Sequence, residues 1–178
     1  MNATTSRALA VARPFITVLM TINLFYALCI TVLLVASVVV PYFRPGWPWE
    51  PLGFKTDGAH PLLPMALQTI CFLGIVGAGL VHVVLRWLRA IVDTVRDGDP
   101  FIAENVRRLR AIAWCVLAGQ GLRLMIVAIA TAVTTRAQPV DLGEGFSFTP
   151  WLAVLLLFVL AEVFAHGARM RADLDGTV

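Results

Sequence analysis

The sequence predicts an all-α membrane protein, a bundle of four transmembrane helices, on three observations. Of its 178 residues, 59% are hydrophobic and only 14% are charged, whereas soluble domains average roughly 45–50% and about 25%. Four apolar runs stand between short polar segments, and a membrane-spanning helix needs about 20 such residues. Arginine is concentrated in alternate polar segments. Together these observations exclude a disordered chain and disfavour a water-soluble globule.

The first predicted span covers residues 15–40. Pro14 suits the first turn of its helix, and Pro41 stops it. The run of about 26 apolar residues exceeds the apolar core of about 7–15 residues in a secretory signal peptide, so we expect a retained anchor. The external loop 41–62 that follows is rich in proline, tyrosine and tryptophan. These aromatic residues favour the headgroup zone, so the loop is expected to cap the bundle there; a ligand-binding loop is the alternative.

The second and third predicted spans, 63–85 and 111–133, are joined by a helical hairpin over residues 86–110. A break at Asp97-Gly98-Asp99-Pro100 should separate its two arms. Gly98 suits the left-handed position that ends a helix. Asp99 suits an N-cap and Pro100 the first position of the next helix.

Each arm of the hairpin carries an apolar stripe at helical spacing, Leu88, Val92 and Val95 on one and Ile102, Val106 and Leu109 on the other. Two interpretations remain open, namely a self-packed hairpin and a docking platform for a cytoplasmic partner. The candidate partner surface consists of Asp97, Asp99, Pro100, Phe101, Glu104 and Asn105.

The fourth predicted span covers residues 151–168 and follows the external loop 134–149. Thr149 is its expected N-cap, and Pro150 stands in its first turn. The helix is expected to continue to about Met170.

The distribution of basic residues predicts the orientation of all four spans. About ten arginines lie before the first span, within 86–110 or after the fourth span, against about three basic residues in the other two loops. The positive-inside rule therefore places both termini and the hairpin in the cytoplasm. The net charge of +3 does not indicate direct nucleic-acid binding, because the arginines cluster beside apolar runs.

Polar side chains inside the spans are the candidate functional residues, since they are costly in hydrocarbon. Arg123 lies near the middle of the third span, where insertion costs roughly 2.5–3.5 kcal/mol, so we expect it to have a partner. Glu162 is the candidate, and its replacement by alanine should destabilise the protein. A structural latch, a site sensing a proton or ligand, and a transport path all remain open. The predicted intramembrane cluster consists of Asn23, His82, Gln120, Arg123, Glu162 and His166.

No pattern in the sequence indicates catalysis, a metal or a cofactor. Cys29, Cys71 and Cys115 lie in apolar runs without zinc-site or CxxC spacing. His82 and His166 alone are a weak indication of haem, because two histidines among four helices match by accident easily. Nucleophile and phosphate-binding motifs are missing. We therefore expect a protein that is not an enzyme.

Two cytoplasm-proximal segments carry a family resemblance. One is Asp99-Pro100-Phe101-Ile102-Ala103-Glu104-Asn105 with Arg108-Leu109-Arg110, and the other is Leu160-Ala161-Glu162-Val163-Phe164 with Gly167-Ala168, Asp173 and Thr177-Val178. Together with the span pattern of the whole chain, they resemble a bacterial family of small four-helix membrane proteins of undefined function, often encoded beside a small helix-turn-helix regulator. The chain departs from the family near His166, where another charged residue is usual, and near Gly176, where a leucine is usual.

The resemblance implies a multi-pass protein of the bacterial cytoplasmic (inner) membrane, surrounded by lipid and with a helix-turn-helix regulator as a possible partner. The expected function is a non-enzymatic regulatory or sensory role. A small transporter or an export or immunity protein that uses the intramembrane polar cluster is the alternative.

Overall fold

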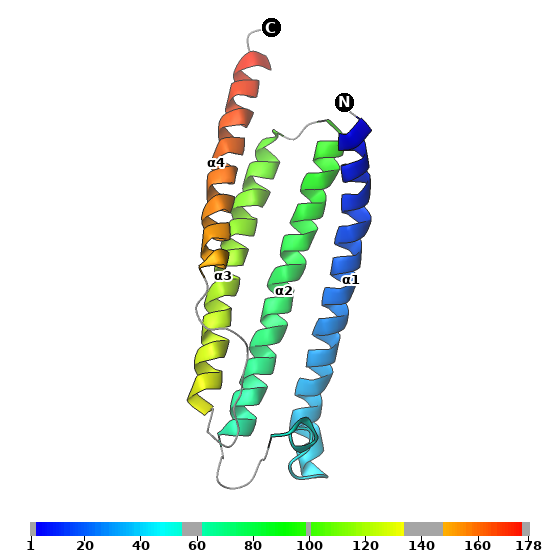
Figure 1. Cartoon of the computed structure of the whole chain (residues 1–178), viewed down its shortest axis with the longest axis vertical. Coiled ribbons are helices and arrows are strands. Elements are labelled where there is room, and N and C mark those ends of the chain that lie inside the picture. Colours follow the sequence, from blue (N-terminus) through cyan, green and yellow to red (C-terminus); the bar gives the residue numbers. More distant parts are fainter. Residues whose placement is uncertain (1–2, 55–61, 99–100, 134–147, 176–178) are drawn as a thin grey trace. The chain divides into compact units, whose positions relative to one another are not determined.

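Four long α-helices make up the structure, a computed structural model that describes residues 3–54, 62–98, 101–133 and 148–175. They are α1 (Ala3–Val39), α2 (Leu63–Arg96), α3 (Ala103–Val133) and α4 (Thr149–Asp175) (Figure 1). Two short 3-10 turns, η1 (Val40–Tyr42) and η2 (Glu50–Leu52), follow α1, and the described residues contain no β-strand. Each α-helix is long and apolar enough to cross a membrane. The predicted fold class is confirmed, while the orientation of the termini stays a prediction.

The helices present an apolar outer surface, and the lipid that suits this surface favours a helical backbone. Large apolar side chains point away from the protein along α1, for example Leu24 (63% exposed) and Phe25 (68% exposed). Such a surface suits lipid, which offers the backbone no hydrogen-bond partners. A helix satisfies its backbone N–H and C=O groups within the same segment, so it can present this surface to a bilayer.

Helix α1 begins earlier than the sequence predicts. It starts at Ala3 and contains Pro14, whereas the expected helix started at Pro14. Proline removes one backbone hydrogen bond, but the residues on either side remain helical. The other boundary agrees with the prediction, because α1 ends at Val39 and Pro41 lies in η1.

The hairpin between α2 and α3 has the predicted continuous arms, with one difference at the turn. Gly98 takes the left-handed conformation, φ +88°, that its position requires. Helix α3 starts at Ala103 rather than Pro100, and the Ile102 carbonyl accepts the amides of Asn105 (3.0 Å) and Val106 (3.4 Å). Ile102 thus occupies the N-cap position. The predicted cap Asp99 and Pro100 lie outside the described residues.

Helix α4 also differs by one residue at its start. It begins at Thr149, and the Phe148 carbonyl accepts the Leu152 amide at 3.0 Å. Phe148 therefore holds the N-cap position expected of Thr149, and Pro150 remains in the first turn. The helix continues beyond Met170 to Asp175. Of the predicted external loop before it, residues 134–147 lie outside the described part of the chain.

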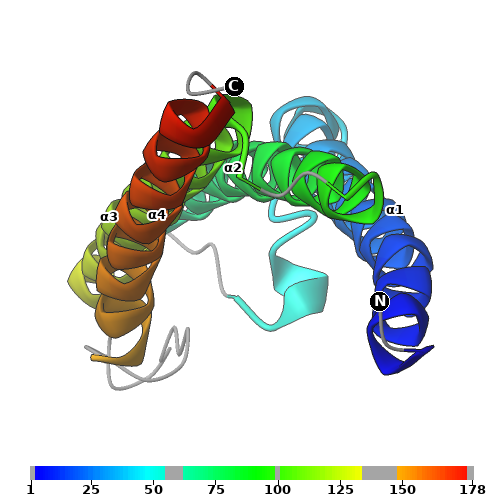
Figure 2. The ribbon, with the colours of Figure 1, turned by 90° about the horizontal axis from the view of Figure 1, so that it is seen from above.

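The chain forms two compact units, each of which we describe by itself. Unit 1 consists of Met1–Asn23, Leu80–Gln120 and Phe148–Val178. Its core contains small and branched apolar side chains, among them Ile112 (5% exposed), Ala113 (0%) and Ala161 (1%). In this unit the first half of α3 lies beside α4 in both views (Figures 1 and 2). The small alanines on both helices suit such a close approach.

Unit 2 consists of Leu24–Gly79 and Gly121–Ser147. Trp49, Leu63 and Leu67 form its buried cluster, against which Leu33, Phe54, Cys71 and Val133 pack. Glycines on α2 let its neighbours come close. A Cβ atom on Gly74 would lie 3.4 Å from Ile30 on α1, and one on Gly77 would lie 3.3 Å from Leu122 on α3.

Candidate functional site

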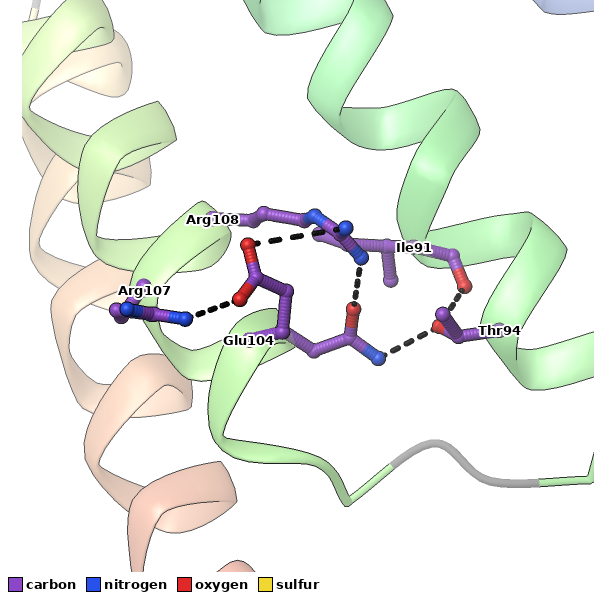
Figure 3. Close-up of polar contacts among 6 residues, drawn as sticks. Ile91, Thr94, Glu104, Arg107 and Arg108 are labelled. Carbon is purple, nitrogen blue, oxygen red and sulfur yellow. Dashed lines mark hydrogen bonds and ion pairs between the residues drawn. The ribbon is translucent and has the colours of Figure 1, made fainter.

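A buried relay of hydrogen bonds joins the two arms of the α2–α3 hairpin (Figure 3). The Arg108 guanidinium donates to Asn105 Oδ1 at 3.0 Å, and Asn105 Nδ2 donates to Thr94 Oγ1 at 2.6 Å. Thr94 Oγ1 in turn donates to the Ile91 carbonyl at 2.7 Å. Asn105 is only 1% exposed. Hydrogen bonds in such a chain polarise and strengthen one another, so the relay holds α3 in one register against α2.

The same turn carries an ion-pair group on its surface. The Glu104 carboxylate pairs with Arg107 and, at 3.8 Å, with Arg108 (Figure 3). The Arg108 side chain is 23% exposed and the Arg107 side chain 76% exposed. Arg108 therefore connects the buried relay to the surface charges, while Arg107 faces solvent.

An aromatic contact ties the start of α3 to α4. The rings of Phe101 and Phe164 have centroids 5.2 Å apart. Phe101 also lies directly over Gly167, where an added Cβ would come within 2.9 Å of Phe101 Cδ1. Further along α3, the rings of Trp114 and Phe158 pack edge to face, with their centroids 5.5 Å apart. Since higher numbers on α3 meet lower numbers on α4, the two helices are antiparallel.

Glu162 lies in a second charged group, with partners other than the predicted one. Its carboxylate is 3.6 Å from Arg110 and 3.4 Å from Arg169, and Arg169 also reaches His166 Nδ1 at 3.4 Å. The expected partner was Arg123, which lies about 20 Å further along α3 than Arg110 at a rise of about 1.5 Å per residue. The antiparallel register of α3 and α4 accounts for the difference, because it sets Glu162 beside Arg110.

Two members of the predicted intramembrane cluster, Glu162 and His166, have a common partner. His166 shares Arg169 with Glu162. Asn23, His82 and Gln120 are half-buried positions in unit 1, and Arg123 is a half-buried position in unit 2. Their membership in one cluster stays a prediction. Among the described residues, no group of three or more histidine, cysteine, aspartate or glutamate side chains could hold a metal ion.

The predicted partner surface needs one correction. Asp97 and Phe101 are exposed and Glu104 is partly exposed, as a docking surface requires. Asn105 is buried and fully engaged in the relay, so it belongs to the hairpin interior instead. Asp99 and Pro100 lie outside the described residues.

Sequence reasoning missed Thr94 and Gly167 as structural determinants. Thr94 is the single hydroxyl residue of segment 86–110, and Asn105 is its single amide. One uncharged polar residue on each arm of a hairpin was a usable signal. The need for glycine at position 167 comes from a ring on a different helix, which no local pattern reveals.

The two segments that carried the family resemblance prove to be neighbours in space. Phe101 and Arg110 of the first contact Phe164, Gly167 and Glu162 of the second. A family model described as "Protein of unknown function (DUF2975)" matches residues 36–178 and includes both segments. The comparisons with curated proteins and with solved structures give no match.

Proposed function

Since the chain belongs to the DUF2975 family, for which no function is defined, we propose its role from the geometry of the hairpin. We propose a multi-pass protein of the bacterial cytoplasmic membrane that catalyses no reaction and signals to a cytoplasmic partner. The α2–α3 turn and the adjoining face of α4 form the docking surface. A helix-turn-helix regulator is the proposed partner, in line with the resemblance of both motif segments.

One observation supports this proposal above the others, namely that exposed side chains at the end of α2 and the start of α3 lie beside a hydrogen bond that joins the two helices. The Asn105–Thr94 bond holds the start of α3 against the end of α2. Above it, Asp97, Phe101 and Arg107 are exposed. Side chains on two helix ends that are bonded to each other lose less entropy on binding a partner than side chains on a loop that must first become ordered.

Site-specific photocrosslinking in native membranes tests the proposal. A photoreactive amino acid at Asp97 should give adducts with a cytoplasmic protein, identified by mass spectrometry. The matched control places the same amino acid at Leu52, which is also exposed but lies in the α1–α2 connection. No adduct at Leu52 is expected.

A charge reversal distinguishes specific docking from chance encounters. Arg107→Glu should abolish the Asp97 adduct, because the Arg107 side chain is 76% exposed and supports no buried contact. Arg44→Glu, which reverses an exposed charge in the α1–α2 connection, should leave the adduct unchanged. Equal adduct yields from wild type and Arg107→Glu, or adducts from Leu52 alone, would contradict the proposal.

A further inference from the structure

An open pocket lies between the α1–α2 connection and the adjoining ends of α1 and α2, and the proposed signalling surface does not use it. Its volume is about 580 Å³, within the range of about 300–1,000 Å³ that is usual for ligand sites. Gly46 and Gly53, at φ +85° and +91°, let the connection turn back on itself. The pocket is lined by Ser37, Val38, Pro41, Tyr42, Pro45, Gly46, Trp47, Trp49, Pro64 and Gln68.

The pocket has a wall residue with an unused hydrogen-bond donor. Trp49 is 4% exposed and packs against Leu63 and Leu67. Its indole Nε1 is buried and has no hydrogen-bond partner among the described residues. An indole N–H can only donate, and buried tryptophans usually find an acceptor. A ligand in the pocket that brings an acceptor oxygen would give this donor a partner.

The rest of the lining restricts the charge of that ligand. Gln68 Nε2 donates to the Ser37 carbonyl at 3.2 Å, and Ser37 Oγ donates to the Leu34 carbonyl at 2.7 Å. The remaining lining side chains are apolar or aromatic, and none carries a charge at neutral pH. The part of the ligand inside this pocket is therefore neutral and largely apolar, with an oxygen such as that of an ester carbonyl.

A smaller hollow of about 380 Å³ shares Pro45 and Trp47 with the first pocket, but its lining includes charged side chains. Arg44 and Glu50 line it, one cationic and one anionic side chain. Arginine suits a phosphate group, and a carboxylate suits an ammonium group. The two hollows side by side match a molecule with a neutral ester region and a head that carries both charges.

The position of the pocket indicates where such a molecule comes from. Ser37 lies near the end of α1 and Pro64 at the start of α2, where the apolar spans end. Tryptophan and tyrosine at such a level are typical of the lipid headgroup zone. We propose that this pocket binds one zwitterionic phospholipid, with an ester carbonyl at Trp49 Nε1 and the headgroup between Arg44 and Glu50.

Native mass spectrometry of the full-length protein in detergent tests the site with three lipids. Phosphatidylethanolamine carries both headgroup charges, phosphatidylglycerol lacks the ammonium, and diacylglycerol has only the ester region. Wild type should bind one phosphatidylethanolamine more tightly than either of the others. Trp49→Phe should weaken the binding of all three lipids by about three- to tenfold, as expected for one lost hydrogen bond.

The headgroup variant separates the two hollows. Arg44→Gln combined with Glu50→Gln should weaken phosphatidylethanolamine and leave diacylglycerol unchanged. Arg96→Gln, at the other end of α2, is the matched charge control and should change nothing. Equal binding of phosphatidylethanolamine and phosphatidylglycerol by wild type would overturn the zwitterionic assignment.

A second variant tests the pocket even if Trp49→Phe does not fold. Val38→Trp keeps the Trp49 indole and fills the pocket from its rim, where Val38 is 52% exposed. It should also reduce binding of phosphatidylethanolamine. Wild-type affinity in both variants would overturn the proposal, because neither the donor nor the pocket volume would then matter.

Discussion

At the scale of single residues, Asn105 shows how burial changes the role of a polar side chain. Its position in a polar turn indicated a surface role, yet it is 1% exposed and bonded at both ends of its amide. A buried amide is costly unless its donors and acceptors are paired. Because Thr94 and Arg108 supply those partners, Asn105 stabilises the hairpin and leaves partner contacts to its exposed neighbours.

We predict that Asn105→Ala destabilises the protein by about 1–3 kcal/mol, since it removes the donor to Thr94 Oγ1 and one acceptor of the Arg108 guanidinium. Thermal unfolding in detergent measures the effect. Thr94→Val keeps the shape of the side chain and removes its hydroxyl. The double variant should show a coupling of about 0.5–3 kcal/mol. Additive effects would mean that the two residues act independently.

Glu162→Ala should cost no more than about 1 kcal/mol. The side chains of Arg110, Glu162 and Arg169 are 55%, 64% and 65% exposed, and such open pairs contribute little. This expectation replaces the larger effect predicted for a buried pair with Arg123. The melting temperatures of Glu162→Ala and of Glu162→Gln, which keeps the side-chain volume, decide between these two expectations. A loss of about 3–5 kcal/mol would instead indicate a buried partner for Glu162.

At the scale of elements, the contact between α3 and α4 depends on a matched large and small residue. Phe101 is 42% exposed, but the part of its ring that faces α4 lies against Phe164 and Gly167. This contact joins the two motif segments and sets their register. The Arg110–Glu162 pair, two to three helical turns further along α3, follows from that register.

We predict that Gly167→Ala weakens the packing of α4 on α3, because the new Cβ would lie 2.9 Å from Phe101 Cδ1. Relative to Gly119→Ala, which gains the same helix propensity, the expected loss is about 1 kcal/mol, at the low end for overpacking, since the exposed ring can partly swing away. Gly119→Ala is the matched control. Its Cβ meets nothing within 4 Å, and alanine is the better helix former, so stability should stay equal or rise.

Lower stability in Gly167→Ala should be restored by Phe101→Leu in the same chain, because the smaller side chain leaves room for the methyl group. Differential scanning fluorimetry of the wild type and the three variants in one detergent makes the comparison. If Gly119→Ala and Gly167→Ala behave alike, the close approach at Phe101 does not control the packing.

At the scale of the whole molecule, four apolar helices and an asymmetric charge distribution define a multi-pass membrane protein. The helices are shown by the structure, while the side that each connection faces rests on the arginine count. The signalling proposal depends on that orientation, because it requires the α2–α3 turn to face the cytoplasm. The lipid site requires only that the α1–α2 connection lie at a membrane surface.

Cysteine labelling in intact cells should confirm this topology. In a background with Cys29, Cys71 and Cys115 replaced by alanine, a cysteine at Asp97 should react with a membrane-impermeant maleimide only after the membrane is permeabilised. A cysteine at Phe43, which is 82% exposed in the α1–α2 connection, should react without permeabilisation. The reverse pattern would invert the topology and with it the proposed partner surface.

Much of the fold follows from sequence because its signals are local. Apolar runs, prolines at helix ends and Gly98 at a left-handed turn act within a few residues, so the four helices and their breaks could be located with small shifts. The start of α1 was the largest error, since one proline lowers helix stability without forcing an end when the chain on both sides stays helical.

The sequence by itself determined the class of the molecule, its apolar spans and the segments of the chain in which its arginines cluster. Only the tertiary structure decided which polar groups meet. Residue spacing does not specify how far one helix slides along another, and a shift of one turn moves a side chain about 5.4 Å. The antiparallel register of α3 and α4 brings Glu162 to Arg110, and side-chain packing buries Asn105 and leaves the Trp49 indole without an acceptor among the described residues.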